Sequence, residues 1–134
     1  GLCGDPEEAL RLGLELLTDL VRAGRDDHSG TLALRHSVAY WTGVSKEASV
    51  TLRLYVELLT DRQRLLAEDH SDTLATRSAV AYWTGAVGDP QAACDLASEL
   101  LLDLVRTSGA NDPVTVAVGR AAAFWSRQCD PPEP

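Results

Sequence analysis

The sequence predicts an all-α protein: a right-handed α-solenoid of six antiparallel helices, built from three 42-residue repeats that are cut out of phase. Three observations predict this class. An aromatic phrase that first reads V-A-Y-W returns twice at a fixed interval, and a second phrase, E-L-L-x-D-x-x-R, returns at the same interval. No segment alternates apolar and polar residues over the length of a strand. Helix hairpins that repeat at a constant period stack into solenoids.

Both phrases keep their register without gaps. The tryptophans of the aromatic phrase are Trp41, Trp83 and Trp125. The second phrase occupies residues 15–22, 57–64 and 99–106. Each repeat therefore contains one short helix with the aromatic phrase and one longer helix with the acidic, leucine-rich phrase.

The first two expected helices cover about 5–23 and 29–42. A proline stands near the start of the first, where proline is tolerated. The second is amphipathic over about four turns, with Trp41 in its apolar arc and Tyr40 in the opposite arc. Gly43 follows at the place where a helix C-terminal glycine belongs.

The third and fourth expected helices cover about 47–66 and 71–84. One apolar face of the third helix is expected to contain Leu52, Leu54, Tyr55, Leu58, Leu59, Leu65 and Leu66. Gly85 is expected to end the fourth helix, as the equivalent glycine ends the second.

The last two expected helices cover about 89–107 and 113–127. Asp112 and Pro113 supply an N-cap and a proline at the first helical position. The solenoid is expected to span residues 1–127, and residues 128–134 are expected to form a proline-rich tail. The first helix has no short helix before it and the last has no long helix after it. Both ends of the stack are therefore expected to expose apolar surface, through which the chain could form a homo-oligomer.

Composition narrows the class of partner. The chain has 134 residues, 45% of them hydrophobic, and a net charge of −8 with a single lysine, which argues against nucleic acid as a partner. No apolar run is long enough to span a membrane, and no signal peptide is expected.

The odd number of cysteines, with no C-x-x-C pair, favours free thiols in the cytoplasm. The cysteines are Cys3, Cys94 and Cys129. With no methionine and Gly1 as its first residue, the chain is expected to be an excised or processed part of a longer protein.

The segment "DHSDTLATRSAVAYWTGAVGDPQAACDLASELLLD" (69–103) resembles the long tetratricopeptide repeats (TPRs) of the kinesin-light-chain type, and most of all their actinobacterial relatives. The resemblance extends over about 5–127. It implies an interaction scaffold with a concave surface for a peptide or protein, within a larger regulatory or signalling protein. The alternative it leaves open is a structural or self-associating segment, the sensor or oligomerisation element of a STAND-type NTPase or regulator. The chain itself has no G-x-x-x-x-G-K-[ST] nucleotide motif.

By the same resemblance, the short helices would line the concave surface. The candidate peptide groove then contains His36, Tyr40, Ser78, Tyr82, Arg120 and Phe124. Three exposed aromatic side chains in a column could bind a peptide, or could only cover their own helices. The other three positions differ between the repeats, and these differences fit either ligand specificity or neutral drift. None of the groove positions is a lysine or an asparagine, the residues that a carboxylate clamp uses.

Two arginines, Arg35 and Arg77, fall within the apolar arcs of their helices, where a charge must be paired. Reflecting each hairpin about its loop places them level with Glu57 and Glu99. The sequence therefore predicts the ion pairs Arg35–Glu57 and Arg77–Glu99, in a structural role.

The three tryptophans are interpreted as packing residues between neighbouring repeats, and Trp83→Ala is expected to cost about 3–5 kcal/mol. His28 and His70 are interpreted as turn or cap residues, because equivalent positions in successive repeats lie too far apart to share a metal ion. No Ser–His–Asp or Cys–His pattern has a supporting context. We expect no enzymatic activity and no cofactor.

Overall fold

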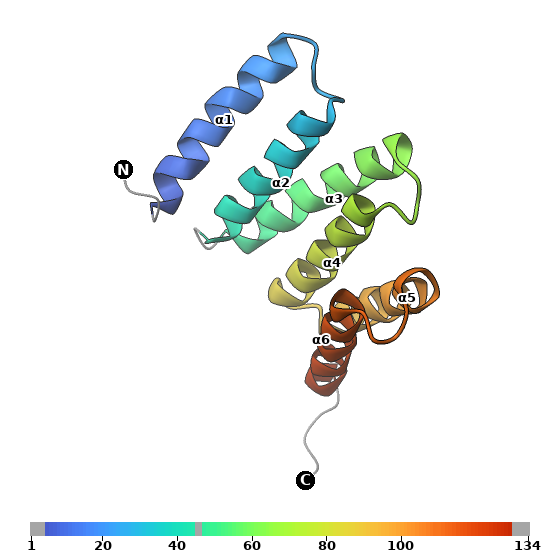
Figure 1. Ribbon diagram of the computed structural model, residues 1–134. Coiled ribbons are helices and arrows are strands. Elements are labelled where there is room, and N and C mark those ends of the chain that lie inside the picture. Colours follow the sequence, from blue (N-terminus) through green and yellow to red (C-terminus); the bar gives the residue numbers. More distant parts are fainter. Residues whose placement is uncertain (1–4, 45–46, 130–134) are drawn as a thin grey trace. The chain divides into compact units, whose positions relative to one another are not determined.

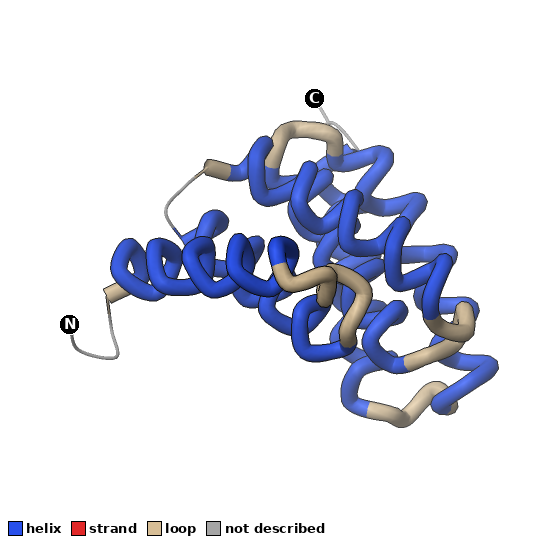
Figure 2. Tube along the Cα trace, turned by 90° about the horizontal axis from the view of Figure 1, so that it is seen from above, coloured by secondary structure: helices blue, strands red, loops and turns tan. Residues whose placement is uncertain are grey.

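The computed structural model describes residues 5–44 and 47–129, and these fold into six helices. The helices are α1 (Pro6–Arg22), α2 (Ser29–Val44), α3 (Ala48–Leu65), α4 (Ser71–Ala86), α5 (Pro90–Ser108) and α6 (Pro113–Cys129). Within the described ranges only helices, turns and loops occur (Figure 2). The all-α class and the six helices that the sequence predicts are therefore confirmed.

The chain divides into two compact units between Leu65 and Leu66. The first unit contains α1, α2 and α3, and its central helix α2 packs against both others (Figure 1). The second unit contains α4, α5 and α6, and here α5 packs against both others. Each unit thus holds one complete short–long helix pair of the repeat, α2 with α3 and α4 with α5, together with one further helix.

Short polar side chains begin three of the helices. The Asp5 carboxylate accepts hydrogen bonds from the backbone N–H groups of Glu7 and Glu8 at the start of α1. Asp89 and Asp112 accept in the same way at the starts of α5 and α6, and both are followed by proline at the first helical position. Such caps satisfy N–H groups that have no partner inside the helix.

The glycines of the aromatic phrase do not end their helices as the sequence suggests. Gly43 and Gly85 lie inside α2 and α4, which continue to Val44 and Ala86. Positive φ angles occur instead at Gly88 (107°), beyond the end of α4, and at comparable loop positions after α1 and α5. A left-handed residue is the usual terminator of a helix, and glycine adopts it without strain.

The core of the second unit is made from leucines and small residues. Its buried members are Leu74, Ala81, Ala97, Leu100, Leu104 and Val118. The core of the first unit includes a tyrosine and an arginine among its most buried side chains, Tyr55 at 2% and Arg62 at 5% exposure. Equivalent positions of the repeat are thus filled by side chains of different chemistry.

The predicted tail begins later than expected. Gln128 and Cys129 belong to α6, whereas residues 130–134 lie outside the described residues. Cys3 lies outside them as well, so its predicted free thiol stays a prediction. Cys94 on α5 is a free, half-buried cysteine, and Cys129 at the end of α6 is half-buried too.

Candidate functional site

Three aromatic side chains at equivalent repeat positions are exposed. Tyr40 on α2 is 53% exposed, Tyr82 on α4 is 56% exposed and Phe124 on α6 is 45% exposed. Large side chains of this kind carry much of the binding energy at protein interfaces when they become buried there. Their exposure places them where the sequence analysis expects them, on the solvent-facing arcs of the short helices.

Each exposed ring packs edge-on against the tryptophan that follows it. The ring centroids lie 5.3 Å apart for Tyr40 and Trp41, and 5.1 Å apart for Tyr82 and Trp83. Phe124 lies 4.8 Å from its neighbouring indole. T-shaped contacts at such distances are favourable for aromatic pairs. The exposed rings are therefore held in one orientation, which lowers the entropy that a ligand would have to remove on binding.

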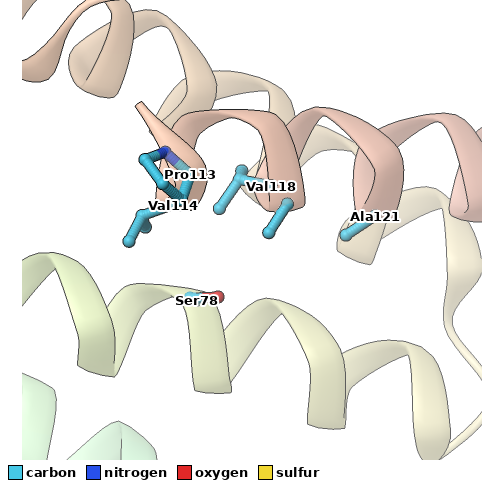
Figure 3. Close-up of a pocket in the computed structure, with 6 residues that line it drawn as sticks. Ser78, Pro113, Val114, Val118 and Ala121 are labelled. Atoms are coloured by element: carbon cyan, nitrogen blue, oxygen red, sulfur yellow. The ribbon is translucent and has the colours of Figure 1, made fainter. Parts of the chain in front are cut away.

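A hollow of about 270 Å³ lies between α4 and α6 in the second unit. Its walls are Ser78 on α4 and an apolar stripe on α6 (Figure 3). The stripe consists of Pro113, Val114, Ala117, Val118 and Ala121. Val114 is 54% exposed, so the lining is open to solvent. A small apolar side chain of a partner would fit such a hollow and remove the exposed valine from water.

The three positions at which the repeats differ have three different environments. Ser78 is half-buried and lines the hollow, and Arg120 is exposed on α6. His36 is half-buried, and its ring packs edge-on against Tyr55 of α3 with centroids 5.1 Å apart. The imidazole of His36 thus covers a tyrosine of its own helix pair, and its place in a groove stays a prediction.

The two arginines of the apolar arcs are paired, but with different carboxylates from those predicted. Arg35 Nη1 lies 2.6 Å from Asp61 Oδ2, and Arg77 Nη1 lies 2.6 Å from Asp103 Oδ2. The predicted partners, Glu57 and Glu99, are exposed and take no part in these pairs. Reflection about the loop treats the two helices as parallel rods of equal rise, and the true partner lies one helical turn further along.

These ion pairs shift the titration of both aspartates. The hydrogen bond from Arg35 is the main cause that holds the pKa of Asp61 below the ordinary aspartate value of 3.8, and Arg64 adds to the shift. Arg77 lowers the pKa of Asp103 in the same way, with Arg106 contributing. Both carboxylates thus stay charged at neutral pH. The arrangement supports a structural role, since each arginine is engaged within its own helix pair.

The tryptophans differ in burial. Trp125 is 9% exposed, whereas Trp41 and Trp83 are only half-buried. Trp125 lies directly over Gly85 of α4, where a Cβ atom would overlap the indole ring. The glycine that the sequence suggested as a helix terminator therefore serves the close approach of α6 to α4.

His28 and His70 precede the short helices α2 and α4. His70 caps α4, where its Nδ1 accepts a hydrogen bond from the Asp72 N–H at 3.1 Å, and this confirms the predicted cap role. In the described part of the chain, no group of three histidine, cysteine or acidic side chains could hold a metal ion. Nor does any helix in that part combine the length and the apolar character that crossing a membrane requires.

Some residues of the candidate site were not found from the sequence. Val114 and Ala121 line the hollow together with Ala117, and their spacing of three and four residues puts them on one face of α6. That spacing was visible in the sequence. The opening beside Ser78, however, depends on how α4 and α6 pack, which periodicity does not specify.

The fold defined by these helices is that of an α-helical repeat protein with exposed aromatic side chains on its short helices. It resembles solved TPR-like repeats. A crystal structure of the nearly identical TPR-like repeats of a Podosopora anserina protein assigned as a kinesin light chain superposes with a TM-score of 0.85, at 20% identity over 92% of this chain. The crystal structure of a single-residue variant of that protein superposes with a TM-score of 0.83, at 20% identity over 91% of this chain.

The chain covers 59% and 57% of the length of those two solved chains. No protein-family model and no curated protein sequence matches it. The structural likeness establishes a TPR-like repeat fold.

Proposed function

We propose that this chain is a protein-interaction scaffold whose short helices present an aromatic, partly hollowed surface to a peptide or protein. The observation that carries the proposal is the hollow between α4 and α6 with two oriented aromatic rings on the same helices, Tyr82 and Phe124. Rigid aromatic side chains beside a small apolar recess are the features on which peptide-recognition surfaces rely.

The chemistry of the lining supports one class of ligand. The recess is apolar apart from the Ser78 hydroxyl, so it suits a small apolar anchor such as valine, leucine or proline. The net charge of −8 favours ligands that carry basic residues beside that anchor. We therefore infer a basic peptide segment with one small apolar anchor as the preferred ligand.

The free thiol of Cys94 is consistent with a reducing compartment, and on that basis we propose the cytoplasm. Repeat scaffolds act by bringing other activities together. We accordingly propose that the segment serves a larger regulatory or signalling protein rather than acting as an enzyme.

The test is selection from a random peptide library displayed on phage, with the whole chain as bait. Enriched peptides should share an apolar anchor flanked by basic residues. Binding of a selected peptide should weaken at least about tenfold with the double variant Tyr82→Ala/Phe124→Ala, since two large contacts are lost. Ser78→Leu, which fills the recess, should also weaken it.

The matched control is Leu102→Ala, which removes an exposed side chain from α5 at 72% exposure, away from the recess. Circular dichroism would verify that all variants remain helical. Selected peptides that bind all variants equally, or a library that yields no enrichment, would refute the proposed surface.

A further inference from the structure

A second recess lies beside the hollow of the second unit. Its volume is about 270 Å³, and it lies where the start of α4, the end of α5 and the start of α6 meet. We call it the end recess, and its lining includes Ser71, Leu74, Ala75, Leu104, Ser108 and Asp112. The three helices belong to one compact unit and contact one another, so the packing of this unit alone forms the end recess.

One residue of α6 belongs to both spaces. Val114 lines the end recess as well as the hollow that contains Ser78, and it is 54% exposed. Its side chain extends from α6 toward α4 (Figure 3). A ligand that occupies the hollow and continues past Val114 therefore reaches the end recess.

The spacing of the two spaces fits alternate residues of an extended peptide. On α4, Ser71 and Ala75 line the end recess and Ser78 lines the hollow. Ser78 follows Ala75 by three residues and Ser71 by seven, which corresponds to about 4.5 and 10.5 Å along the helix. Side chains at positions i and i+2 of an extended chain point to the same side and lie about 7 Å apart. A residue in the hollow would thus place the residue two positions away in the end recess.

The end recess combines an apolar floor with a polar rim. Leu74 and Leu104 are buried, at 7% and 3% exposure. Ser71 and Ser108 are exposed, and Asp112 is half-buried. Lysine and arginine side chains have an apolar stem that covers such a floor and a cationic head that stays at a polar rim.

Asp112 supplies the charge that would recognise the cationic head. Its Oδ2 accepts a hydrogen bond from the Val114 N–H at 3.0 Å, and its carboxylate takes part in none of the ion pairs of the described residues. Arg106 of α5 pairs with Asp103 at 3.6 Å, and the first cationic residue along α6 is Arg120, eight positions further on. The charge of Asp112 is therefore available to a basic residue of a ligand.

We propose that the end recess binds a lysine or arginine side chain two positions from the small apolar anchor, with its stem over Leu74 and Leu104 and its cationic head on Asp112. This inference rests on the proposed function and sharpens it. The net charge of the chain favours basic residues anywhere in a ligand, whereas the end recess selects one position. Asp112 and Ala75 become specificity residues of the same surface.

The experiment is the selection from the random peptide library on phage, repeated with variants of the whole chain as bait. Peptides enriched on the wild-type chain, aligned on their apolar anchor, should carry lysine or arginine two positions away on one side. Asp112→Asn should keep the anchor and lose this preference. Asparagine caps a helix as well as aspartate does, so the variant removes the charge and keeps the cap of α6.

The matched control is Asp89→Asn. Asp89 caps α5 through a hydrogen bond from the Ala92 N–H, at the opposite end of that helix from the end recess. The control thus makes the same change of charge and of cap, and it should leave the basic preference intact. Circular dichroism would verify that both variants remain helical.

A double-mutant cycle with one selected peptide measures the contact. Replacing its basic residue by glutamine should weaken binding to the wild-type chain about three- to tenfold, as expected for a partly exposed charged hydrogen bond. The same replacement should change binding to Asp112→Asn less than about twofold, because the pair is then already absent. Fluorescence anisotropy of the labelled peptide would give all four affinities.

A second variant tests the space and not the charge. Ala75 is exposed and lines the end recess but not the hollow, so Ala75→Leu narrows the end recess alone. It should weaken binding of the selected peptide and leave unchanged the binding of a peptide with glycine in place of the basic residue.

The outcomes separate this inference from the proposed function. Apolar anchors without a basic residue two positions away would overturn the inference and leave the proposed function standing. A basic preference that survives in Asp112→Asn, or that Asp89→Asn reduces equally, would do the same. A library that yields no enriched anchor would overturn both.

Discussion

The two helix pairs α2–α3 and α4–α5 are copies of the same sequence repeat, and they differ most in the side chains buried between their helices. Both keep the same ion pair, Arg35–Asp61 in the first and Arg77–Asp103 in the second, at the same 2.6 Å distance. The first pair buries Tyr55 beneath His36, whereas the second has Ala97 and Ser78 at those positions.

A second contrast lies further along the same long helices. The first pair buries Arg62 and the second buries Leu104 at the equivalent position. The comparison shows that the ion pair belongs to the repeat itself, while the volume between the helices is free to vary. Ser78, one of the small residues of the second pair, lines the hollow between α4 and α6.

The largest expected effect on stability is at Trp125, the buried tryptophan of α6. Trp125→Ala should lower the free energy of unfolding by about 3–5 kcal/mol, because it removes a buried indole and leaves a cavity. Trp83→Ala should cost less, since Trp83 is only half-buried. Urea unfolding followed by circular dichroism would measure both. Equal losses of unfolding free energy in the two variants would contradict the difference in burial between Trp125 and Trp83.

The glycine beneath Trp125 permits a coupled test. Gly85→Ala should cost about 1–3 kcal/mol through overpacking against the indole. In the Trp125→Ala background the same change should be neutral or stabilising, since alanine favours the helix once the ring is gone. Additive effects would argue against the close approach of α6 to α4.

The difference between Arg62 in the first pair and Leu104 in the second is tested by the substitution Leu104→Arg. Leu104→Arg should cost about 3 kcal/mol, because the apolar core of the second unit offers a guanidinium no partner. Leu102→Arg, on the exposed side of the same helix, should change stability by less than about 0.5 kcal/mol. A stable Leu104→Arg chain would show that the two interiors are interchangeable.

The shared ion pairs should give smaller and equal effects. Arg35→Gln and Arg77→Gln should each cost about 1 kcal/mol, since both arginines are mostly covered but their aspartate partners remain partly exposed. Urea unfolding at neutral pH would measure both. A clear difference between them would mean that the surrounding interiors, and not the repeat, determine the strength of the pair.

The smallest expected effect is on acid stability. Because pairing lowers the pKa of Asp61 and Asp103 in the folded chain, their contribution is full above the ordinary value of 3.8 and is lost as the pH falls through the lower folded values. Asp103→Asn should therefore destabilise the chain at neutral pH, and this effect should fade as the pH falls below the ordinary aspartate value of 3.8. A stability difference that stays constant with pH would contradict the shift.

Most of the fold could be predicted from the sequence, because the aromatic phrase and the E-L-L-x-D-x-x-R phrase each occur three times at a period of 42 residues. Apolar spacing predicted the helices, and the burial of Arg77 required a carboxylate partner. The choice of Asp103 over Glu99 could not be predicted, because it depends on the tilt between two helices and not on their order along the chain.

The candidate site was less accessible to sequence reasoning. The exposed face of Tyr82 followed from the helical period, but the packing of the His36 ring on Tyr55 of the next helix could not be predicted. Gly85 was misread since a glycine that ends a helix and one that admits a neighbouring ring look alike in a sequence. Both features depend on contacts between helices, which the residue pattern of a single helix does not specify.

The packing of Trp125 over Gly85 also supplies a built-in optical signal. With Trp41 and Trp83 changed to phenylalanine, the remaining indole is the buried one, and its emission should move to longer wavelength whenever α6 leaves α4 and water reaches the ring. The chain would then report, without any attached dye, whether a ligand that enters beside α6 holds this helix in place or displaces it.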